Sequence, residues 1–366
     1  MKGLLYTTAT LALCASAAGA AGIERSRLPY AALFEQGRYV ELGFSHVTPS
    51  VSGEYTGPFP GLGGSATTGN MAESYTALTF AYKADINDKL AYAVFINTPY
   101  GADALYQQGF YTGLEAHWSS TQIATVVKYK ATDRISVYGG LRYVESKANI
   151  IIPPSLLGGF TYTADGEKDG RFGYTIGAAY EIPDIALRVG LTYENAITHK
   201  FDTAESFGAP PVTTTTSVTM PQSLTLDFQS GVAKDTLVFG SIKWAEWSVW
   251  EVRPPIYDGV MSDSITEFDN DVITYQLGVG RKLNDNLSVF ARVGHEKANG
   301  GSASRLSPTD GQTSFGIGGT WRQDKMKITA GIEYAKLGDA TTGAPTLTEF
   351  SNNSAVGFGL SVGYNF

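Results

Sequence analysis

The chain is organised by a repeated alternation of bulky apolar and small or polar residues. Segments of about ten residues place an apolar side chain at every second position, as in Leu187, Val189, Leu191 and Tyr193. A period of two is typical of β-strands that have one apolar face. Strands of this length can cross a bilayer when they are tilted, whereas a membrane helix needs an apolar run of about twenty residues, which the chain lacks after its N-terminal segment. The pattern therefore predicts membrane-spanning strands.

Six short polar turns separate these segments and recur at intervals of about fifty residues. They lie at 84–88, 131–134, 182–184, 232–235, 283–286 and 322–325. Between successive turns lie two strands and one longer, irregular loop. Short turns at one end of a barrel and long loops at the other are typical of bacterial outer-membrane proteins. We therefore expect an all-β fold, a transmembrane antiparallel barrel with short periplasmic turns and long extracellular loops.

The alternation predicts about fourteen strands in one barrel domain, residues 37–366. The expected strands are 38–47, 74–83, 90–96, 121–130, 135–143, 172–180, 185–193, 224–228, 237–247, 273–279, 287–293, 315–321, 326–334 and 356–366. Fourteen strands with both termini in the periplasm need six periplasmic turns, which is the number of turns in the sequence. The second face of each strand carries Gly, Ser, Thr and Ala, whereas a soluble sandwich would expose charged residues. Bulky residues outside and small residues inside indicate lipid around a confined lumen.

The two ends of the chain support an outer-membrane location. Residues 1–20 contain Lys2, an apolar stretch and small residues at a possible cleavage site, which together predict a signal peptide. Residues 21–36 then form a short segment before the barrel. The last strand alternates apolar residues and ends in Phe366, which resembles the signal read by the barrel-assembly machinery. We expect a multi-pass barrel in the bacterial outer membrane, in contact with lipid and lipopolysaccharide and present as a monomer.

Composition excludes several classes of function. The single cysteine, Cys14, lies in the predicted signal peptide, so disulfides and thiolate metal sites are not expected. A net charge of −8 argues against nucleic acid as a partner. We expect no metal and no cofactor.

Several stretches, in order and spacing, resemble the FadL/OmpP1/TodX family of outer-membrane channels. They are 87–101, 191–202, 220–248 and 275–287, and the likeness covers residues 37–366. The resemblance implies uptake of hydrophobic compounds, long-chain fatty acids above all or else aromatic hydrocarbons. It also implies an N-terminal hatch with an Asn-Pro-Ala motif that plugs the barrel. Residues 21–36 are short and lack that motif, so a reduced hatch is expected and the family's gating is in doubt.

Two predicted extracellular loops are rich in apolar side chains, which is unexpected for loops in contact with water. One contains Leu105, Tyr106 and Phe110, and the other contains Ile151, Leu156, Leu157 and Phe160. Clustered apolar residues in an extracellular loop suggest a capture surface for hydrophobic molecules. The alternative is a self-packed cap over the mouth of the barrel.

Basic residues recur on the face expected to line the lumen. Arg142, Lys243 and Arg292 lie near mid-depth, with Lys128 and Arg188 on the same face. A guanidinium or ammonium group there could bind the carboxylate of a fatty acid. The alternative is a set of internal salt bridges to acidic neighbours such as Glu194.

A candidate gate follows the third strand. Pro99 cannot donate to a strand ladder and Gly101 weakens one, so a kink or pairing gap is expected. The family resemblance implies that a kink here opens the wall sideways and lets the ligand enter the bilayer. The alternative is a strand that simply ends at its loop.

Enzymatic activity is not expected. His117 and Ser119 share one face of a strand, the minimum for a base and a nucleophile, but a role in stabilising the rim of the barrel is favoured. The acidic loop 258–271 suggests either divalent cations or a solvated surface. The sequence thus favours a channel for hydrophobic compounds. A general diffusion porin and a structural or adhesive barrel remain as alternatives.

Overall fold

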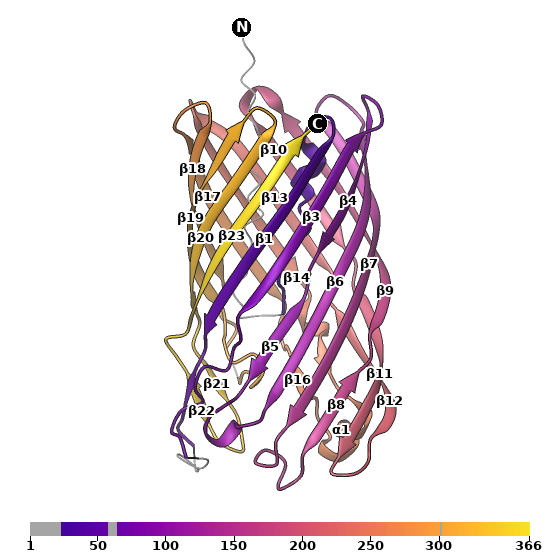
Figure 1. Cartoon of the computed structure of the whole chain (residues 1–366), viewed down its shortest axis with the longest axis vertical. Coiled ribbons are helices and arrows are strands. Elements are labelled where there is room, and N and C mark those ends of the chain that lie inside the picture. The colour runs from indigo at the N-terminus through magenta and orange to yellow at the C-terminus, as the bar shows by residue number, and fades with distance from the viewer. Residues whose placement is uncertain (1–22, 58–63, 301) are drawn as a thin grey trace.

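The computed structural model describes residues 23–57, 64–300 and 302–366 and contains a closed antiparallel β-barrel (Figure 1). The predicted signal peptide lies outside the described residues. Ten of the fourteen wall strands in the described part are continuous. They are β1 (Tyr39–Ser50), β3 (Tyr75–Asp85), β6 (Glu115–Lys130), β7 (Ile135–Ile152), β14 (Thr236–Ala245), β17 (Val272–Lys282), β18 (Leu287–Glu296), β19 (Gln312–Gln323), β20 (Met326–Leu337) and β23 (Ser354–Asn365). The fourteen-stranded barrel predicted from the sequence is confirmed.

Each of the other four wall strands is interrupted and consists of two pieces. The pairs are β4 (Leu90–Asn97) with β5 (Gly101–Leu105), β8 (Tyr162–Gly166) with β9 (Asp169–Ile182), β10 (Leu187–Glu194) with β11 (Ile197–Phe207), and β12 (Val212–Met220) with β13 (Ser223–Ala233). These breaks are the places where the wall departs from a regular ladder. One of them, between β4 and β5, coincides with the expected kink.

The barrel closes by pairing its first and last strands. β1 runs antiparallel to β23 along its whole length, from Tyr39 opposite Asn365 to Ser50 opposite Ser354. Short turns join the strands at the end that holds the C-terminus (Figure 1). Asp235 and Asp324 occupy the tightest of these turns with φ of 59° and 52°, a left-handed conformation that Asp tolerates better than most residues. The 3-10 helix η3 (Pro183–Ile185) forms another turn.

Side chains divide between the two faces of the wall according to size. Leu42, Leu78, Leu141 and Phe172 point outward and are 62%, 62%, 64% and 73% exposed. Such exposure of large apolar groups is unfavourable in water and favourable in lipid. The inward positions of the same strands carry many Ala, Gly, Thr and Ser residues together with a few large ones such as Lys83, Tyr138 and Arg142, which are buried.

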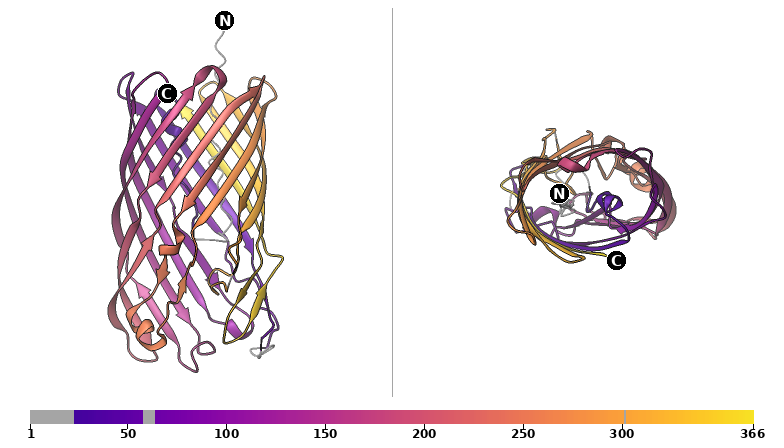
Figure 2. Two further views of the ribbon diagram at one scale, coloured as in Figure 1. Left: turned by 180° about the vertical axis from the view of Figure 1, so that it is seen from behind. Right: turned by 90° about the horizontal axis from the view of Figure 1, so that it is seen from above.

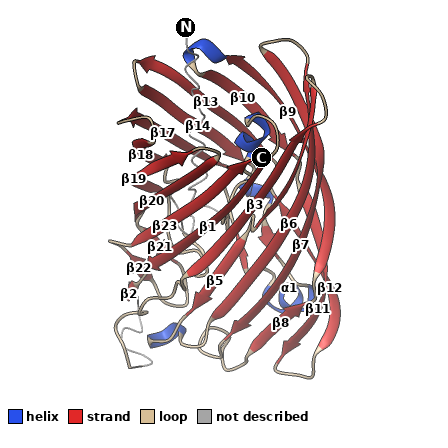
Figure 3. Ribbon diagram, turned by 45° about the horizontal axis from the view of Figure 1, so that its top comes forward, coloured by secondary structure: helices blue, strands red, loops and turns tan. Residues whose placement is uncertain are grey.

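The opposite end is covered by loops that pack on one another. They contain β2 (Gly53–Tyr55), β15 (Glu251–Val252), β16 (Thr266–Glu267), β21 (Ala340–Thr342), β22 (Thr348–Phe350), α1 (Pro255–Met261), η2 (Gly109–Tyr111) and η4 (Trp247–Val249). β2, β22 and β21 form a small sheet. Figure 3 shows α1, β2, β21 and β22 at the end of the barrel away from the C-terminus. We call this region the extracellular cap.

Aromatic contacts hold the cap together. The Tyr111 ring packs edge-on against Tyr55 and Tyr106, with centroids 5.2 and 5.3 Å apart. The Tyr111 hydroxyl lies 2.8 Å from Thr348 Oγ1 and 3.1 Å from the Thr346 carbonyl oxygen, to which it donates. Burial raises the pKa of Tyr55 to about 12.

The N-terminal segment lies inside the lumen. Figure 2 shows a short indigo helix within the ring of strands when the barrel is seen from above. The 3-10 helix η1 (Tyr30–Phe34) packs against β3 and β4, and Leu28 and Leu33 are buried. Residues 23–36, the described part of the segment 21–36 that was predicted to be a reduced hatch, therefore occupy part of the cross-section of the lumen.

None of the helices in the described residues has both the length and the apolar character needed to cross a bilayer.

Candidate functional site: an interrupted wall beside an apolar cavity

The ladder between the second and third wall strands is broken. β3 pairs with β4 from Asp85 opposite Ala91 to Thr79 opposite Asn97, and the pairing ends there. β5 pairs with β6 on its other side, starting with Gly101 opposite Ser119. Main-chain contact on the β3 side resumes only beyond the break, where the Glu73 N–H donates to the Asp103 carbonyl oxygen at 3.0 Å. We call this break, between Asn97 and Asp103, the wall gap.

The N-terminal segment occupies the wall gap as a short extra strand. The Arg25 N–H donates to the Pro99 carbonyl oxygen at 2.8 Å, and the Gly101 N–H donates to the Ile23 carbonyl oxygen at 2.8 Å. Glu24 forms an antiparallel bridge with Tyr100. The edge of the strand that β3 leaves unpaired is thus satisfied by residues 23–25, which avoids the cost of exposing main-chain polar groups within a membrane wall.

Side chains attach the N-terminal segment to both ends of the wall gap. Ser26 Oγ donates to the Thr98 carbonyl oxygen at 2.7 Å, and Asn97 Nδ2 donates to the Ser26 carbonyl oxygen at 3.0 Å. At the other end the Arg25 guanidinium pairs with Asp103 at 3.1 Å. Its central carbon also lies 3.4 Å from the centre of the Tyr75 ring, a cation–π contact.

Gly101 allows this arrangement because it has no side chain. A Cβ atom at this position would lie 2.9 Å from Arg25 Nε and 3.2 Å from the Trp118 carbonyl oxygen. Pro99 contributes differently, because it has no N–H to donate to a neighbouring strand. Both residues predicted from the sequence as a gate therefore lie at the wall gap and contact the N-terminal segment.

An apolar cavity of about 80 Å³ lies on the lumen side of the wall gap. By the same measure a void of about 10–15 Å³ accommodates one water molecule, so the cavity has room for a small organic molecule. Its lining includes Ile23 of the N-terminal segment, Ala102 and Ala104 of β5, and the larger side chains Trp118, Ile150, Phe201, Val218, Trp250 and Phe268. Lys, Arg, Asp and Glu do not occur among the described residues that line it.

The basic residues predicted in the lumen are paired with acidic ones. Arg142 lies 3.0 Å from Glu194. Lys243 pairs with Glu24 of the N-terminal segment, and Arg292 pairs with Glu333 on β20. The arrangement matches the alternative of internal salt bridges, and none of the three residues lines the apolar cavity.

Three further lysines hold the other end of the N-terminal segment. Lys83 donates to the carbonyl oxygens of Glu35 and Gly37 at 2.6 and 3.1 Å. Lys128 donates to the Leu33 carbonyl oxygen, and Lys327 lies 2.9 Å from the Glu35 carboxylate. Arg188 places its guanidinium 4.4 Å from the centre of the Phe34 ring. The segment is thus tethered to the wall on several sides near the periplasmic end.

The residues predicted to capture ligand lie in or against the extracellular cap. Tyr106 and Phe110 are buried within it, and Leu156 and Leu157 pack against it while half-buried. Leu105 and Ile151 are also half-buried. Phe160 is 56% exposed. Of the seven residues, Phe160 presents the most apolar surface to solvent.

A Ser–His–Asp arrangement occurs that the sequence did not reveal. Ser146 Oγ lies 3.1 Å from His199 Nε2, and His199 Nδ1 lies 2.9 Å from Asp169 Oδ2. The order of contacts is that of a serine hydrolase triad. However, Ser146 and His199 are 1% and 0% exposed, and Asp169 also accepts two hydrogen bonds from Arg171 at 2.8 Å.

The position of Ser146, His199 and Asp169 indicates that they hold neighbouring strands of the wall together. β9 pairs with β10 only as far as Thr175, and β11 pairs with β8 from Thr203 onward. Asp169 of β9 and His199 of β11 lie between these two ladders, where the main chains of β9 and β11 are not paired with each other. The three residues come from β7, β9 and β11, so spacing along the sequence gave no signal of their contact.

Comparisons with known proteins give a consistent result. Residues 12–366 match a family described as "Outer membrane protein transport protein (OMPP1/FadL/TodX)". No curated protein matches.

Solved structures share the fold at low sequence identity. A FadL homologue from Pseudomonas aeruginosa has 14% identity and a TM-score of 0.76, with 98% of each chain covered. The toluene transporter TodX from P. putida has 16% identity and a TM-score of 0.66, with 91% of each chain covered. The toluene transporter TbuX from Ralstonia pickettii has 14% identity and a TM-score of 0.59, covering 91% of this chain and 90% of that one.

Proposed function

The chain belongs to the OMPP1/FadL/TodX family of outer-membrane transport proteins, and we propose that it takes up compact, neutral hydrophobic compounds that bind in the apolar cavity. The observation that carries the proposal is the cavity wall, in which alanine, valine, isoleucine and aromatic side chains predominate and His117 is the one ionisable side chain among the described residues. Members of the family transport hydrophobic compounds across the outer membrane, and the cavity suggests which kind this chain prefers.

Burial of apolar surface would drive binding. Each square ångström of apolar surface removed from water contributes about 25 cal/mol. A carboxylate in the same cavity would lose its hydration, which is costly, and the ring nitrogens of His117 already face the carboxylates of Asp103 and Glu115. The chemistry of the cavity therefore favours an aromatic hydrocarbon over a fatty acid, although the sequence analysis favoured the fatty acid.

A fatty acid would need a cation that already has a partner. Arg142 would have to exchange Glu194 for the ligand, and Lys243 would have to release Glu24. Release of Glu24 would also loosen the N-terminal segment, since Glu24 belongs to the extra strand in the wall gap. Uptake of fatty acids would thus be coupled to movement of that segment, whereas binding of a neutral compound in the cavity would not require it.

The route that we propose begins at the extracellular cap and ends at the wall gap. Phe160, Leu156 and Leu157 would make the first contacts with a ligand. Ile23 lines the cavity and belongs to the extra strand, so displacement of residues 23–25 would open the cavity toward lipid between Pro99 and Gly101. An apolar ligand is more soluble in the bilayer than in water, and this difference would drive its movement from the cavity into lipid.

The test is a binding series on the detergent-purified protein. Toluene, fatty acids of increasing length and a small sugar would be compared by isothermal titration calorimetry. We expect binding of toluene with a negative heat-capacity change, the mark of apolar burial, and weaker binding of short fatty acids. Affinity that rises with each methylene while toluene does not bind would favour fatty acids. Conductance in planar bilayers without binding of either class would favour a general diffusion porin.

A further inference from the structure

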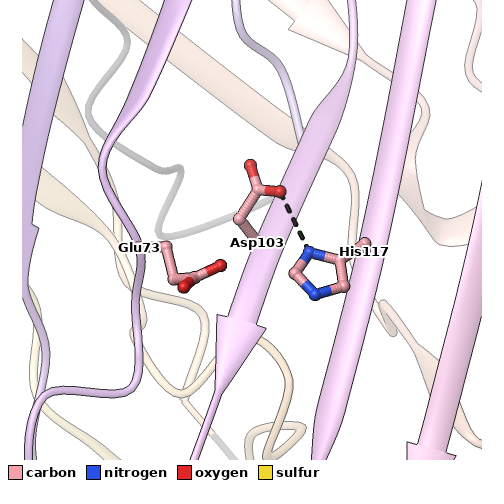
Figure 4. Close-up of side chains that lie close together, drawn as sticks. All are labelled: Glu73, Asp103 and His117. Atoms are coloured by element: carbon pink, nitrogen blue, oxygen red, sulfur yellow. Dashed lines mark hydrogen bonds and ion pairs between the residues drawn. The ribbon is translucent and has the colours of Figure 1, made fainter.

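One cluster of side chains at the wall gap is not explained by transport of apolar molecules. Glu73 precedes β3, Asp103 lies on β5, and His117 lies directly opposite Asp103 on β6. Figure 4 shows the three side chains directed toward a common space. One donor atom from each lies within 4.8 Å of the other two. Glu73 is exposed and the other two are half-buried, so solvent can reach the cluster.

We propose that Glu73, Asp103 and His117 bind a divalent cation of the zinc class. Zinc accepts one imidazole nitrogen together with carboxylate oxygens, at about 2.0–2.2 Å from each. Two donors at the corners of a tetrahedron of that size are about 3.3–3.5 Å apart. His117 Nδ1 and Asp103 Oδ1 are 3.2 Å apart. The separation of these two atoms is thus close to that of two zinc ligands, and Glu73, whose carboxylate oxygen lies within 4.8 Å of both, would move closer to provide the third ligand.

The remaining polar atoms of the two central residues are already held. His117 Nε2 lies 3.0 Å from the Glu115 carboxylate, and Asp103 Oδ2 lies 3.1 Å from the Arg25 guanidinium. Metal-bound histidines commonly donate their second ring N–H to a carboxylate, which fixes the ring and its tautomer. Glu115 is in the position for that role. Arg25 orients the Asp103 carboxylate in the same way.

The hydrogen bonds of His117 support the same conclusion. A neutral imidazole has one N–H, and both ring nitrogens face carboxylate oxygens. When Nε2–H donates to Glu115, Nδ1 and Asp103 Oδ1 are both acceptors directed at the same space, and a cation between them would satisfy both. Of the carboxylates of Glu73, Asp103 and Glu115, that of Asp103 pairs with the Arg25 guanidinium, and the ion pairs of the described residues give the other two no lysine or arginine. A divalent cation would therefore neutralise the cluster, which a single proton would not.

The bound ion would join three segments across the interrupted wall. It would link the chain before β3 to β5 and β6 and would hold Asp103 in place for Arg25. This consequence for the N-terminal segment rests on the proposed function, whereas binding of the ion does not.

Zinc binding can be measured on the full-length protein without an affinity tag. Metal is removed by chelation, and Zn²⁺ is then added during equilibrium dialysis with elemental analysis. We expect one equivalent per chain, and Co²⁺ in its place should give visible absorption bands typical of a low-symmetry site. His117→Ala should weaken binding at least tenfold. Glu115→Gln should keep the stoichiometry and weaken affinity about tenfold, the usual effect of removing such a supporting contact.

His46→Ala is the matched control, because His46 is an exposed histidine on the same barrel whose ring contacts Thr76. It should bind zinc like the unaltered chain. A shift in electrophoretic mobility on heating shows that each variant is a folded barrel. Absence of stoichiometric zinc binding, or equal losses in His117→Ala and His46→Ala, would overturn the proposal. Toluene binding measured on the same samples tests the proposed function separately.

Discussion

Arg25 and Asp103 form an ion pair, with Nη2 and Oδ2 3.1 Å apart, that joins the N-terminal segment to the wall where two neighbouring strands are not paired. The Arg25 side chain is 5% exposed and that of Asp103 is 32% exposed. The contact is therefore shielded from water on one side and reachable on the other. It connects the part of the chain that fills the lumen with the part that completes the barrel, so its strength should govern how often the wall gap opens.

Replacement of Arg25 with alanine should release the N-terminal segment from the wall gap. Hydrogen bonds to charged groups contribute about 1.5–3 kcal/mol, and about 1.4 kcal/mol changes an equilibrium tenfold. We expect the segment to be displaced roughly ten times more often. Maleimide labelling of Ser26→Cys with and without Arg25→Ala would report it, because both samples lack the Ser26 hydroxyl contacts equally and the one native cysteine, Cys14, lies in the predicted signal peptide.

Arg27→Ala is the control for this experiment. Arg27 lies two residues further on in the same segment, and its guanidinium is 3.4 Å from Asp227, with both groups partly exposed. Partly exposed pairs contribute little, so the labelling rate should stay close to that of the unaltered protein. Equal acceleration by both variants would show that loss of positive charge, rather than the Asp103 contact, controls the segment.

Addition of a single methyl group at Gly101 should act on the same contact. The new Cβ atom would lie 2.9 Å from Arg25 Nε, closer than carbon and nitrogen tolerate, so the Arg25 side chain must move. We expect Gly101→Ala to accelerate labelling as Arg25→Ala does. The two changes combined should then have hardly more effect than either alone, since residues in contact are not additive. Fully additive effects would show that Gly101 acts through another neighbour, such as Trp118.

Alternation of apolar residues was enough to predict the barrel, because each wall strand has one face toward lipid and one face toward the lumen. Leu141 and Phe172 face outward and Arg142 and Gly173 face inward, as the period of two requires. The six polar turns could also be located from the sequence. This regularity is local, so the inward and outward faces of a strand can be predicted from its own sequence without knowledge of the neighbouring strands.

The contacts that define the candidate site join distant parts of the chain. Nothing near Glu24 in the sequence indicates that it pairs with Lys243 and bridges to Tyr100. Tyr106 could be identified as apolar and placed in a loop, yet its burial depends on how separate loops pack over the barrel. The kink at Pro99 was predictable because proline has a local effect, whereas the segment that fills the wall gap was not.

Deprotonation of Tyr55 should occur at unusually high pH. Burial raises its pKa to about 12 from an ordinary value of 10.0. Stability that depends on the neutral hydroxyl is therefore fully present below pH 10 and is lost as the pH rises through about 12. Its oxygen accepts a hydrogen bond from the Tyr111 N–H at 3.1 Å and donates to the Gln108 carbonyl oxygen, so ionisation should loosen the extracellular cap.

Absorbance of tyrosinate near the red edge of the protein spectrum would test this pKa. The difference between the unaltered protein and Tyr55→Phe, titrated side by side, should show one group ionising near pH 12. A difference curve centred near pH 10 would mean that Tyr55 is solvated and that the cap is open in solution.

Substitution of Val218 by threonine should weaken binding of a neutral ligand without changing the shape of the cavity. Val218 lies on β12, is 2% exposed and lines the apolar cavity. Threonine has nearly the same volume, but its hydroxyl group would be buried beside the ligand. Burial of an unpaired hydroxyl costs about 1–3 kcal/mol, so toluene affinity measured by calorimetry should fall about tenfold. Val212→Thr provides a matched control on the same strand, since Val212 is 55% exposed and does not line the cavity. If both variants bind toluene as tightly as the unaltered protein, the ligand lies elsewhere in the barrel.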